Sequence, residues 1–516
     1  MPNHLRPLLL ALLLLALAVP ATAAEKTLVF GRAADSTFLD PAKYLDNESA
    51  MVIENIFEGL VRYADDSTRI EPALAESWET SPDGLVWTFH MRSGLHFSDG
   101  TLCDAAAAAF SFSRRIDPAN PFFREEFTRM DSSLKNIASV QAVDSLTFRI
   151  TLKEPYAPLL STLATHSSYL VSPAAVRIWG DDFDKHPVGA GPFVFASWTP
   201  GERIELVANP EYYRGRPRVD RVVFKVVPDI KVRLLELKSG AIQIMDGVGP
   251  ADRDEILKTP RLTLDTKPGL NVGYLAMNML HPPFDNLDVR RAVNHAINKE
   301  NLVKLLYRGM AEVAKNPIPP SMWVYNDAVA DYAYDPAKAR ELLRKAGFPN
   351  GFATTLWAMP VSRPYMPEPD RIARAIQANL AAVGIKATLV THDWKTYLAK
   401  AYAGEHDMCL LGWVGAGDPD NFFSNLFSTD KAVPPHASNI AFFTDPAAQK
   451  LIAEAQRESD QVRRAELYKK IQVIIHDQAP WAPLAHAYQA MARDRRVTGV
   501  IHHQTGVVRF ARAEMP

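Results

Sequence analysis

Residues 412–423 combine three glycines, one tryptophan and two aspartates, which are residue types suited to contacting a ligand. Glycine lets backbone amides approach a ligand closely, and tryptophan offers a flat apolar surface. The residues from His406 to Leu411 predict a short buried strand, and Asp418 followed by Pro419 predicts the N-cap and first position of a helix. Because ligands of α/β proteins bind in turns at the carboxyl ends of strands, we expect a ligand site here, with Trp413 as its leading candidate.

The two aspartates of this stretch, Asp418 and Asp420, have two interpretations that the sequence leaves open. Their carboxylates either contact a ligand or cap the helix and offset the positive end of its dipole. An aspartate followed by proline at a helix start favours capping. Trp413 therefore remains the stronger ligand candidate of the stretch.

The rest of the chain contains none of the short motifs that mark common catalytic sites. It has no Gly-x-Ser-x-Gly elbow, no His-Glu-x-x-His pair, no phosphate-binding loop and no spaced cluster of cysteines and histidines. His502 and His503 are adjacent, and adjacent side chains of a strand point to opposite faces, which argues against a shared metal ion. The sequence therefore predicts a binding protein and not an enzyme, with no cofactor and no metal site.

The first 24 residues predict export from the cytoplasm. They combine an apolar run, Leu8 to Val19, with the small-residue end Ala21-Thr22-Ala23-Ala24, which is typical of a cleaved signal peptide and too short for a comfortable membrane span. No cysteine follows this end, so we expect a soluble protein without a lipid anchor. The formal net charge of −2 and the lack of a basic run argue against a nucleic-acid partner.

Length and cysteine content limit the architecture. The chain has 516 residues, 47% of them hydrophobic, and this length predicts two or three lobes. Its two cysteines, Cys103 and Cys409, both lie in apolar surroundings. One disulfide and two free thiols are both open, and we favour buried thiols because free cysteine packs as a small apolar residue.

Strand and helix patterns alternate along both halves of the chain. Strand–helix–strand succession of this kind indicates α/β lobes with mixed sheets. No low-complexity linker is present, which indicates that ordinary strands cross between the lobes. The clearest expected helices are residues 48–60, 105–116, 231–239 and 371–383, and the clearest expected strands are residues 85–92, 271–278 and 386–390.

A series of motifs spans nearly all of the chain after the predicted signal peptide. The first run is Leu74-Ala75-Glu76-Ser77-Trp78, then Asp83-Gly84, Trp87-Thr88-Phe89 and Phe97-Ser98-Asp99-Gly100-Thr101. Later runs are Pro187-Val188-Gly189-Ala190-Gly191-Pro192-Phe193, Asn209-Pro210-Glu211-Tyr212-Tyr213 and Phe284-Asp285-Asn286. Together they resemble the extracellular solute-binding proteins of family 5, the peptide and nickel receptors of bacterial ABC importers.

The resemblance implies a bilobal α/β fold, the type II periplasmic-binding-protein fold of the three-subdomain peptide-receptor class, with mixed sheets and a hinge. Residues 25–68, 189–275 and 478–516 are expected to form the core of one lobe. Residues 69–188 are expected to form an additional subdomain on it, and residues 276–477 the other lobe. In such a fold, ligand binding closes the lobes by a hinge motion.

The resemblance also supplies candidate binding residues. Met359-Pro360-Val361-Ser362-Arg363-Pro364-Tyr365 matches a motif whose arginine holds the ligand carboxylate in dipeptide-binding members of the family. Arg363 is therefore the candidate carboxylate clamp, with Tyr365 beside it, and Trp394 matches an aromatic residue of the family's pocket. The alternatives are an ordinary ion pair for Arg363 and ordinary packing for Trp394 and Trp413.

The loop after Gly412 departs from the family pattern. Dipeptide receptors of the family read Gly-Trp-Thr-Gly-Asp-Asn-Gly-Asp-Pro-Asp-Asn-Phe there, and their first aspartate binds the peptide amine. Here the loop is one residue shorter, Ala416 stands in place of that aspartate, and Asp418 matches the second one. We therefore expect that an amine is held elsewhere or that the ligand lacks one.

The function implied by the resemblance is that of a periplasmic, monomeric substrate-binding component of an ABC importer. Its partners would be a dipeptide-like or oligopeptide-like ligand, the membrane permease subunits and, through them, ATPase subunits. The retained Arg363 and the lost loop acid predict a peptide-like carboxylate broader than a simple dipeptide. The alternatives are a nickel or metal-chelate receptor of the same family, and an exported peptide hydrolase or chaperone.

Overall fold

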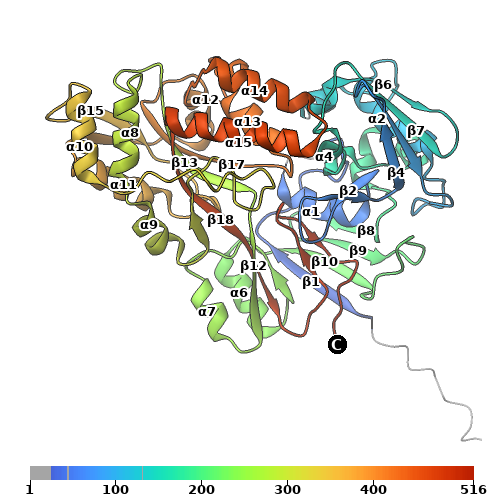
Figure 1. Cartoon of the computed structure of the whole chain (residues 1–516). Coiled ribbons are helices and arrows are strands. Elements are labelled where there is room, and N and C mark those ends of the chain that lie inside the picture. The colour runs from blue at the N-terminus through green and yellow to red at the C-terminus, as the bar shows by residue number, and fades with distance from the viewer. Residues whose placement is uncertain (1–24, 44–45, 131) are drawn as a thin grey trace, which may run out of the picture.

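The structure is a computed structural model that describes residues 25–43, 46–130 and 132–516. The predicted signal peptide, residues 1–24, lies outside the described residues. Figure 1 shows one broad, twisted sheet through the middle of the molecule, with α13, α14 and α15 above it and a smaller sheet, β4 to β7, at one end. Among the described residues, no helix is both long enough and apolar enough to cross a membrane.

The main sheet has twelve strands and mixes parallel and antiparallel pairs, as predicted for α/β lobes. Its strand order is β16-β15-β17-β13-β18-β11-β1-β10-β9-β8, and β12 and β14 pair with β18 beside this path. One part of the sheet comprises β1 (Thr27–Arg32), β8 (Phe193–Thr199), β9 (Arg203–Ala208), β10 (Arg221–Val226) and β11 (Ile244–Met245). The other part comprises β13 (Asn271–Met277), β14 (Ala311–Val313), β15 (Ala353–Trp357), β16 (Lys386–Val390) and β17 (Met408–Val414).

A long strand, β18 (Trp481–Asp494), joins the two parts of the main sheet. Its first half pairs with β13 and β14, and its second half pairs with β11 and with β12 (Leu262–Pro268). Strand β12 leads into β13, so the chain crosses twice between the parts at the same place. There the Asn271 side chain pairs with the Ala487 peptide, donating from Nδ2 to the carbonyl at 2.8 Å and accepting from the amide at 2.9 Å.

A separate four-stranded sheet of order β4-β5-β7-β6 lies at the end of the molecule nearest α2 and α4 (Figure 1). The strands of the smaller sheets are β2 (Val61–Tyr63), β3 (Ile70–Pro72), β4 (Ala75–Thr80), β5 (Val86–Met91), β6 (Ile137–Ala142), β7 (Thr147–Leu152), β19 (Ile501–His502) and β20 (Val508–Arg509). The α-helices are α1 (Asn47–Ile56), α2 (Ala105–Ile116), α3 (Glu125–Met130), α4 (Leu159–Leu163), α5 (Pro173–Trp179), α6 (Ile230–Ser239), α7 (Arg253–Lys258), α8 (Leu287–Ala296), α9 (Lys299–Leu302), α10 (Pro336–Lys345), α11 (Pro369–Ala381), α12 (Trp394–Tyr402), α13 (Asp420–Phe427), α14 (Pro446–Arg457) and α15 (Gln461–Gln478).

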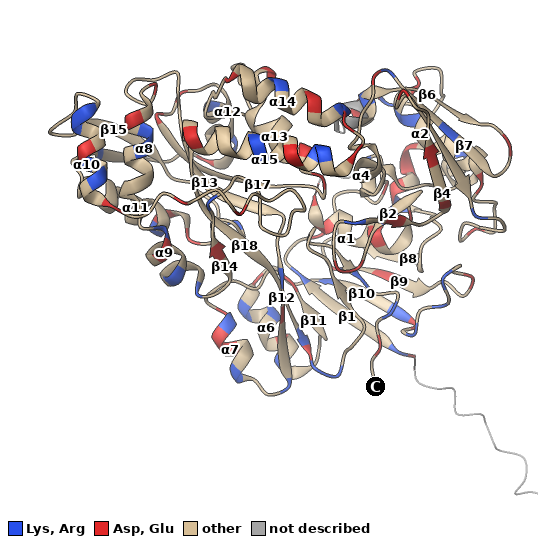
Figure 2. Ribbon diagram, viewed as in Figure 1, with Lys and Arg blue, Asp and Glu red and all other residues tan. Residues whose placement is uncertain are grey.

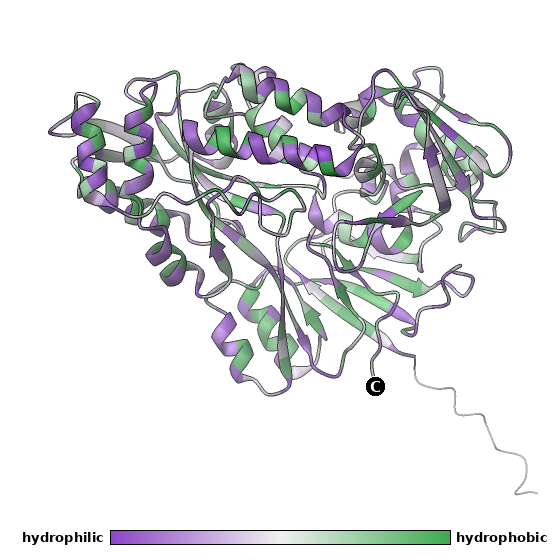
Figure 3. Cartoon of the chain, in the orientation of Figure 1, coloured by the Kyte–Doolittle hydropathy of each residue, from purple (hydrophilic) through white to green (hydrophobic). Residues whose placement is uncertain are grey.

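Distinct hydrophobic cores underlie these sheets. The largest packs β13, β15 and β17 against helices that include α8, α11 and α13, and a second packs β1, β9 and β10 against α1. A third lies between the four-stranded sheet and α2. In Figure 3 the strands are largely hydrophobic and the outer helix faces hydrophilic, while Figure 2 shows both signs of charge interspersed over the helices and loops.

Both cysteines are buried and free, which confirms the favoured prediction. Cys103 belongs to the core of the four-stranded sheet, and Cys409 belongs to the core around β17. Burial raises the pKa of the Cys409 thiol to about 12, so this thiol is protonated at neutral pH.

The predicted elements are found within a few residues of their expected bounds. Helix α2 and strand β16 have the expected bounds, and the helix expected at 231–239 is α6. The helix expected to reach Leu60 ends at Ile56, because the Ile56 carbonyl, which would accept from the Leu60 amide in a longer helix, instead accepts from the Gly191 amide at 2.9 Å. Tertiary pairing therefore overrides the helical pattern at this end.

Two glycines that face each other across β13 and β17 make room for Tyr365. Gly273 and Gly412 are register partners; the Tyr365 ring lies against Gly412, and the Tyr365 carbonyl lies against Gly273. A Cβ atom at position 412 would lie 2.2 Å from the Tyr365 ring and 2.6 Å from the Val272 carbonyl oxygen. The glycine at position 412 is therefore a packing requirement.

We predict that Gly412→Ala lowers the free energy of unfolding by about 1–3 kcal/mol, because the added methyl group forces Tyr365 or the strand to move. Urea unfolding measures this change. Gly249→Ala is the matched control, since its Cβ would lie 3.6 Å from the nearest atom, an Asp252 oxygen, and we expect a change within about 0.5 kcal/mol. Equal stability of the two variants would contradict the packing assignment.

Candidate functional site

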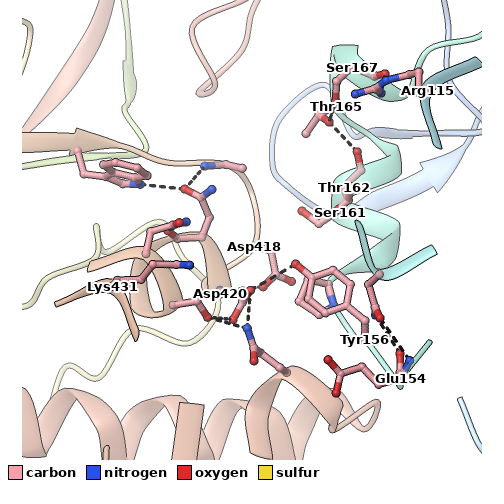
Figure 4. Close-up of a pocket in the computed structure, with 18 of the residues that line it drawn as sticks. Arg115, Glu154, Tyr156, Ser161, Thr162, Thr165, Ser167, Asp418, Asp420 and Lys431 are labelled. Carbon is pink, nitrogen blue, oxygen red and sulfur yellow. Dashed lines mark hydrogen bonds between the residues drawn. The ribbon is translucent and has the colours of Figure 1, made fainter. Parts of the chain in front are cut away.

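A cleft of about 630 Å³ lies between the α13 end of β17 and the segment that follows the four-stranded sheet (Figure 4). Its lining comes from segments far apart in the sequence, which the fold brings to opposite walls. The wall next to α13 is contributed by residues between Trp413 and Lys431, and the other wall by residues between Glu154 and Ser167. The lining includes Tyr156, Trp413, Ala416, Asp418, Asp420 and Gln456.

Direct contacts close the cleft at one edge. The Ala157 amide donates to the Gln456 carbonyl at 2.7 Å, and exposed Arg457 and Glu154 form an ion pair at 3.0 Å. Gly417 also packs closely against the β2–β3 hairpin, since a Cβ atom there would lie 2.6 Å from the Tyr63 ring. The two walls therefore meet in this conformation.

Trp413 lines the cleft, although it does not lie in a loop as predicted. Strand β17 continues through Gly412 to Val414, because Trp413 pairs with Val272 of β13. The half-buried indole donates from Nε1 to Asn421 Oδ1 at 2.9 Å, and the Ala416 amide donates to the same oxygen at 3.1 Å. Asn421, which the sequence analysis did not single out, thus orients both Trp413 and the turn.

Asp418 also lines the cleft, but its carboxylate is already fully engaged. It accepts two hydrogen bonds from Arg464 of α15, both at 2.7 Å, and one from the Asp420 amide at 2.9 Å. Burial acts to lower the pKa of Arg464, but the charge of Asp418, its hydrogen bonds and the nearby Tyr468 and Asp420 together raise it. Helix α13 begins at Asp420 with Pro419 as its N-cap, so the predicted helix start, Pro419 with Asp418 as N-cap, was one residue early.

Asp420 is buried at the cleft and has no ion-pair partner among the described residues. Ser424 donates its hydroxyl to Oδ1, while the hydrogen-bond donors to Oδ2 among the described residues are Tyr156 Oη and Gln456 Nε2, both at 3.4 Å. Figure 4 shows Tyr156 pointing at this carboxylate from the opposite wall. Burial, followed by the charge of Asp418, raises the pKa of Asp420 to about 6.

The other predicted residues form a second group that does not belong to the lining of this cleft. The exposed Arg363 guanidinium lies 5.3 Å from the Trp394 ring, and no described carboxylate is within ion-pair distance of it. Trp394 begins α12 and stacks on Tyr397. Tyr365 is buried against Gly412, so its packing connects this group to the strand that carries Trp413.

His502 and His503, the residues considered for nickel binding, are both buried. His503 stacks on Tyr63 and its Nε2 lies 3.1 Å from the Ser67 carbonyl oxygen. Burial lowers the pKa of both rings to about 4. Their contacts are those of packed side chains.

Sequence reasoning identified the wall that carries Trp413, Ala416 and Asp418 but missed its partners. Tyr156 and Gln456 come from distant segments without a recognisable motif, so no local pattern pointed to them. Asp420 was considered as a ligand contact or a helix cap, but the sequence does not show that Arg464 pairs with Asp418 and not with Asp420.

Comparisons with known proteins show clear relatives. A family model described as bacterial extracellular solute-binding proteins, family 5 Middle, matches residues 69–434. The chain is 37% identical over 512 residues to di/tripeptide-binding protein 1 of Pseudomonas aeruginosa (strain UCBPP-PA14), covering 95% of this chain and 94% of the relative. It is 38% identical over 474 residues to heme-binding protein A of Haemophilus influenzae, covering 89% and 86%. The solved structure of the periplasmic binding protein DppA from Helicobacter pylori in complex with peptide STSA has a TM-score of 0.77 and 36% identity, covering 93% and 96%.

We predict that Asp420→Asn stabilises the unliganded protein at pH 7.5 by about 1–3 kcal/mol. The pKa of Asp420 is higher in the folded protein than its ordinary value of 3.8, so ionisation opposes folding above about pH 6. This cost disappears as the pH falls through 6 towards 4, and the difference between variant and wild type should be about halved at pH 5. Urea unfolding at the two pH values measures it.

Asp418→Asn is the matched control and should act in the opposite direction. It leaves the buried Arg464 guanidinium without its partner and should lower stability by about 3–5 kcal/mol at both pH values. A loss of stability for both variants would show that the Asp420 charge makes a stabilising contact, contrary to the geometry.

Proposed function

Because this chain belongs to the bacterial extracellular solute-binding proteins of family 5, we propose that it captures peptides or peptide-like carboxylates for an ABC importer. The observation that carries the proposal is the cleft between two walls of the molecule, about 630 Å³ in volume. This volume lies within the usual range for small-molecule sites. Relatives named as di/tripeptide-binding and a structure in complex with a peptide support the ligand class.

The chemistry of the cleft suits a peptide backbone. Its lining consists largely of hydroxyl, amide and carboxylate side chains, with Trp413 and Tyr156 as aromatic members. Polar groups can pair with the amides of an extended ligand, and the aromatic surfaces add affinity without selecting one side chain. A heme-binding relative exists, but this polar lining matches a peptide better than an apolar macrocycle.

Arg363 and Trp394 are proposed to hold the ligand carboxylate. The guanidinium lies over the indole ring, which orients it without neutralising its charge. An arginine oriented in this way can bind a carboxylate with two parallel hydrogen bonds. Trp413, Ala416, Asp418 and Tyr365 complete the proposed binding region, with Asp418 and Tyr365 in supporting positions.

Lobe closure is proposed to occur at the two crossings formed by β12–β13 and β18, where few residues connect the parts of the sheet. Residues 25–68, 189–275 and 478–516 would then move with the subdomain at 69–188, against residues 276–477. The closed protein would dock on two permease subunits, which pass the ligand inward with ATPase energy. We place this monomer in the periplasm.

We predict that a bound ligand stabilises the protein and is recovered unchanged. The protein is screened against a pool of dipeptides, tripeptides and glutathione. A bound member of the pool at a concentration of about a hundred times its own dissociation constant should add about 2.7 kcal/mol to the unfolding free energy. Thermal unfolding with and without the pool measures binding, and mass spectrometry of the released ligand measures its integrity. Cleavage that scales with protein concentration would instead favour a hydrolase, and stabilisation by nickel–histidine alone would favour the metal-chelate alternative.

We predict that Arg363→Ala weakens binding of a peptide carboxylate by about 1.5–3 kcal/mol and leaves binding of the matching peptide amide unchanged. Isothermal titration with both forms measures this difference. Arg374→Ala is the control, because Arg374 is exposed and already pairs with Asp370 at 2.9 Å. An equal loss for carboxylate and amide would exclude the clamp.

A further inference from the structure

The cleft contains two acidic side chains from one short turn that differ in their bonding. Asp418 is saturated by Arg464, which supplies two short hydrogen bonds and a full positive charge. Asp420, two residues later, receives no such partner within the described part of the chain. Among the residues that the structure describes, Arg464 is the one cation in an ion pair with this turn, so the Asp420 carboxylate has no cation bound to it.

Of the carboxylate oxygens of Asp418 and Asp420, the most weakly bonded one is Oδ2 of Asp420. Its two donors, Tyr156 Oη and Gln456 Nε2, lie at 3.4 Å, which is at the long end of hydrogen-bond distances. A carboxylate with weak donors and no cation is costly to bury. It would gain most from a ligand that brings positive charge and N–H donors together.

The other charged groups of the lining have partners of their own. Glu154 is exposed and forms an ion pair with Arg457, Lys431 forms one with Asp430 at 3.0 Å, and Arg115 donates to the Ser167 carbonyl oxygen. Position 416, in the turn itself, is an alanine and offers no charge. Asp420 is thus the acidic group of the cleft that is most in need of a cation.

We propose that Asp420 binds the protonated amino group of the ligand, with Tyr156 as a second acceptor across the cleft. An ammonium carries three N–H donors. The Asp420 carboxylate and the Tyr156 hydroxyl oxygen face each other across the cleft, so one ammonium beside them can donate to both (Figure 4). This inference rests on the proposed function and narrows its ligand class to peptides or peptide-like molecules with a free amine. It also explains how a peptide amine can be bound although Ala416 stands in place of the aspartate that binds it in dipeptide receptors of the family.

The position of Asp420 connects amine binding to closure. Its helix α13 belongs to one wall, while Tyr156 belongs to the segment next to the four-stranded sheet. An ammonium held between them would add a charge-assisted bond to the contact between the walls, beside the Ala157–Gln456 hydrogen bond. Ligands with a blocked amine would bring no such bond.

The test uses an equimolar pool of alanyl dipeptides, Ala-X, and the same pool after N-acetylation. Each pool is equilibrated with the protein by dialysis, and retained peptides are quantified by mass spectrometry. We expect the wild type to retain free-amine peptides at least tenfold better than acetylated ones. Asp420→Asn should reduce this preference to less than threefold, and Asp327→Asn, an exposed acid remote from the lining, should leave it unchanged.

Each outcome has a distinct meaning. If the wild type retains both pools equally, or if Asp420→Asn keeps the tenfold preference, Asp420 is not the amine site, while the proposed function stands. If neither pool is retained, the proposed function fails and this inference fails with it. The wild-type comparison needs no variant, and near-ultraviolet circular dichroism checks that Asp420→Asn is folded before its preference is interpreted.

Discussion

The buried ion pair between Asp418 and Arg464 sets the geometry of the cleft. Arg464 projects from α15 and also contacts the rings of Trp323 and Tyr468, so it fixes Asp418 from below the turn. With Asp418 fixed, the chain enters α13 at Asp420, and Asn421 is placed to hold both the Trp413 indole and the Ala416 amide. A buried pair of this kind is costly to break, because either partner alone would be an unpaired charge.

The second constraint is the path of the chain between the two parts of the main sheet. Strand β18 supplies hydrogen bonds to both parts, and the Asn271 side chain pairs with the Ala487 peptide where the crossings meet. His486 adds a contact to the Asn271 carbonyl oxygen at 2.8 Å. Few backbone torsions at this place therefore determine how the walls of the cleft approach each other, which suits a hinge.

Local patterns predicted most elements because they depend on neighbours in sequence. Helix α2 and strand β16 follow from periodicity alone, whereas the end of α1 depends on the distant Gly191 amide and could not be read locally. The stretch from Gly412 was predicted as a turn that holds a ligand because it contains three glycines, but Gly412 lies in strand β17, where its lack of a side chain accommodates Tyr365. Tyr156 and Gln456 reach the cleft only through tertiary folding, so no sequence pattern identifies them.

The packing of Tyr365 on Gly412 has a consequence for selectivity. Arg363 lies two residues from Tyr365, and Trp413 lies next to Gly412, so one rigid piece of backbone carries both groups. In the proposed hinge motion this piece would move as a whole, and the backbone spacing between Arg363 and Trp413 would stay unchanged. In the proposed binding mode, the backbone entropy of setting this spacing is lost during folding and not during binding. Such a preset spacing would favour ligands of one length before the proposed closure of the lobes.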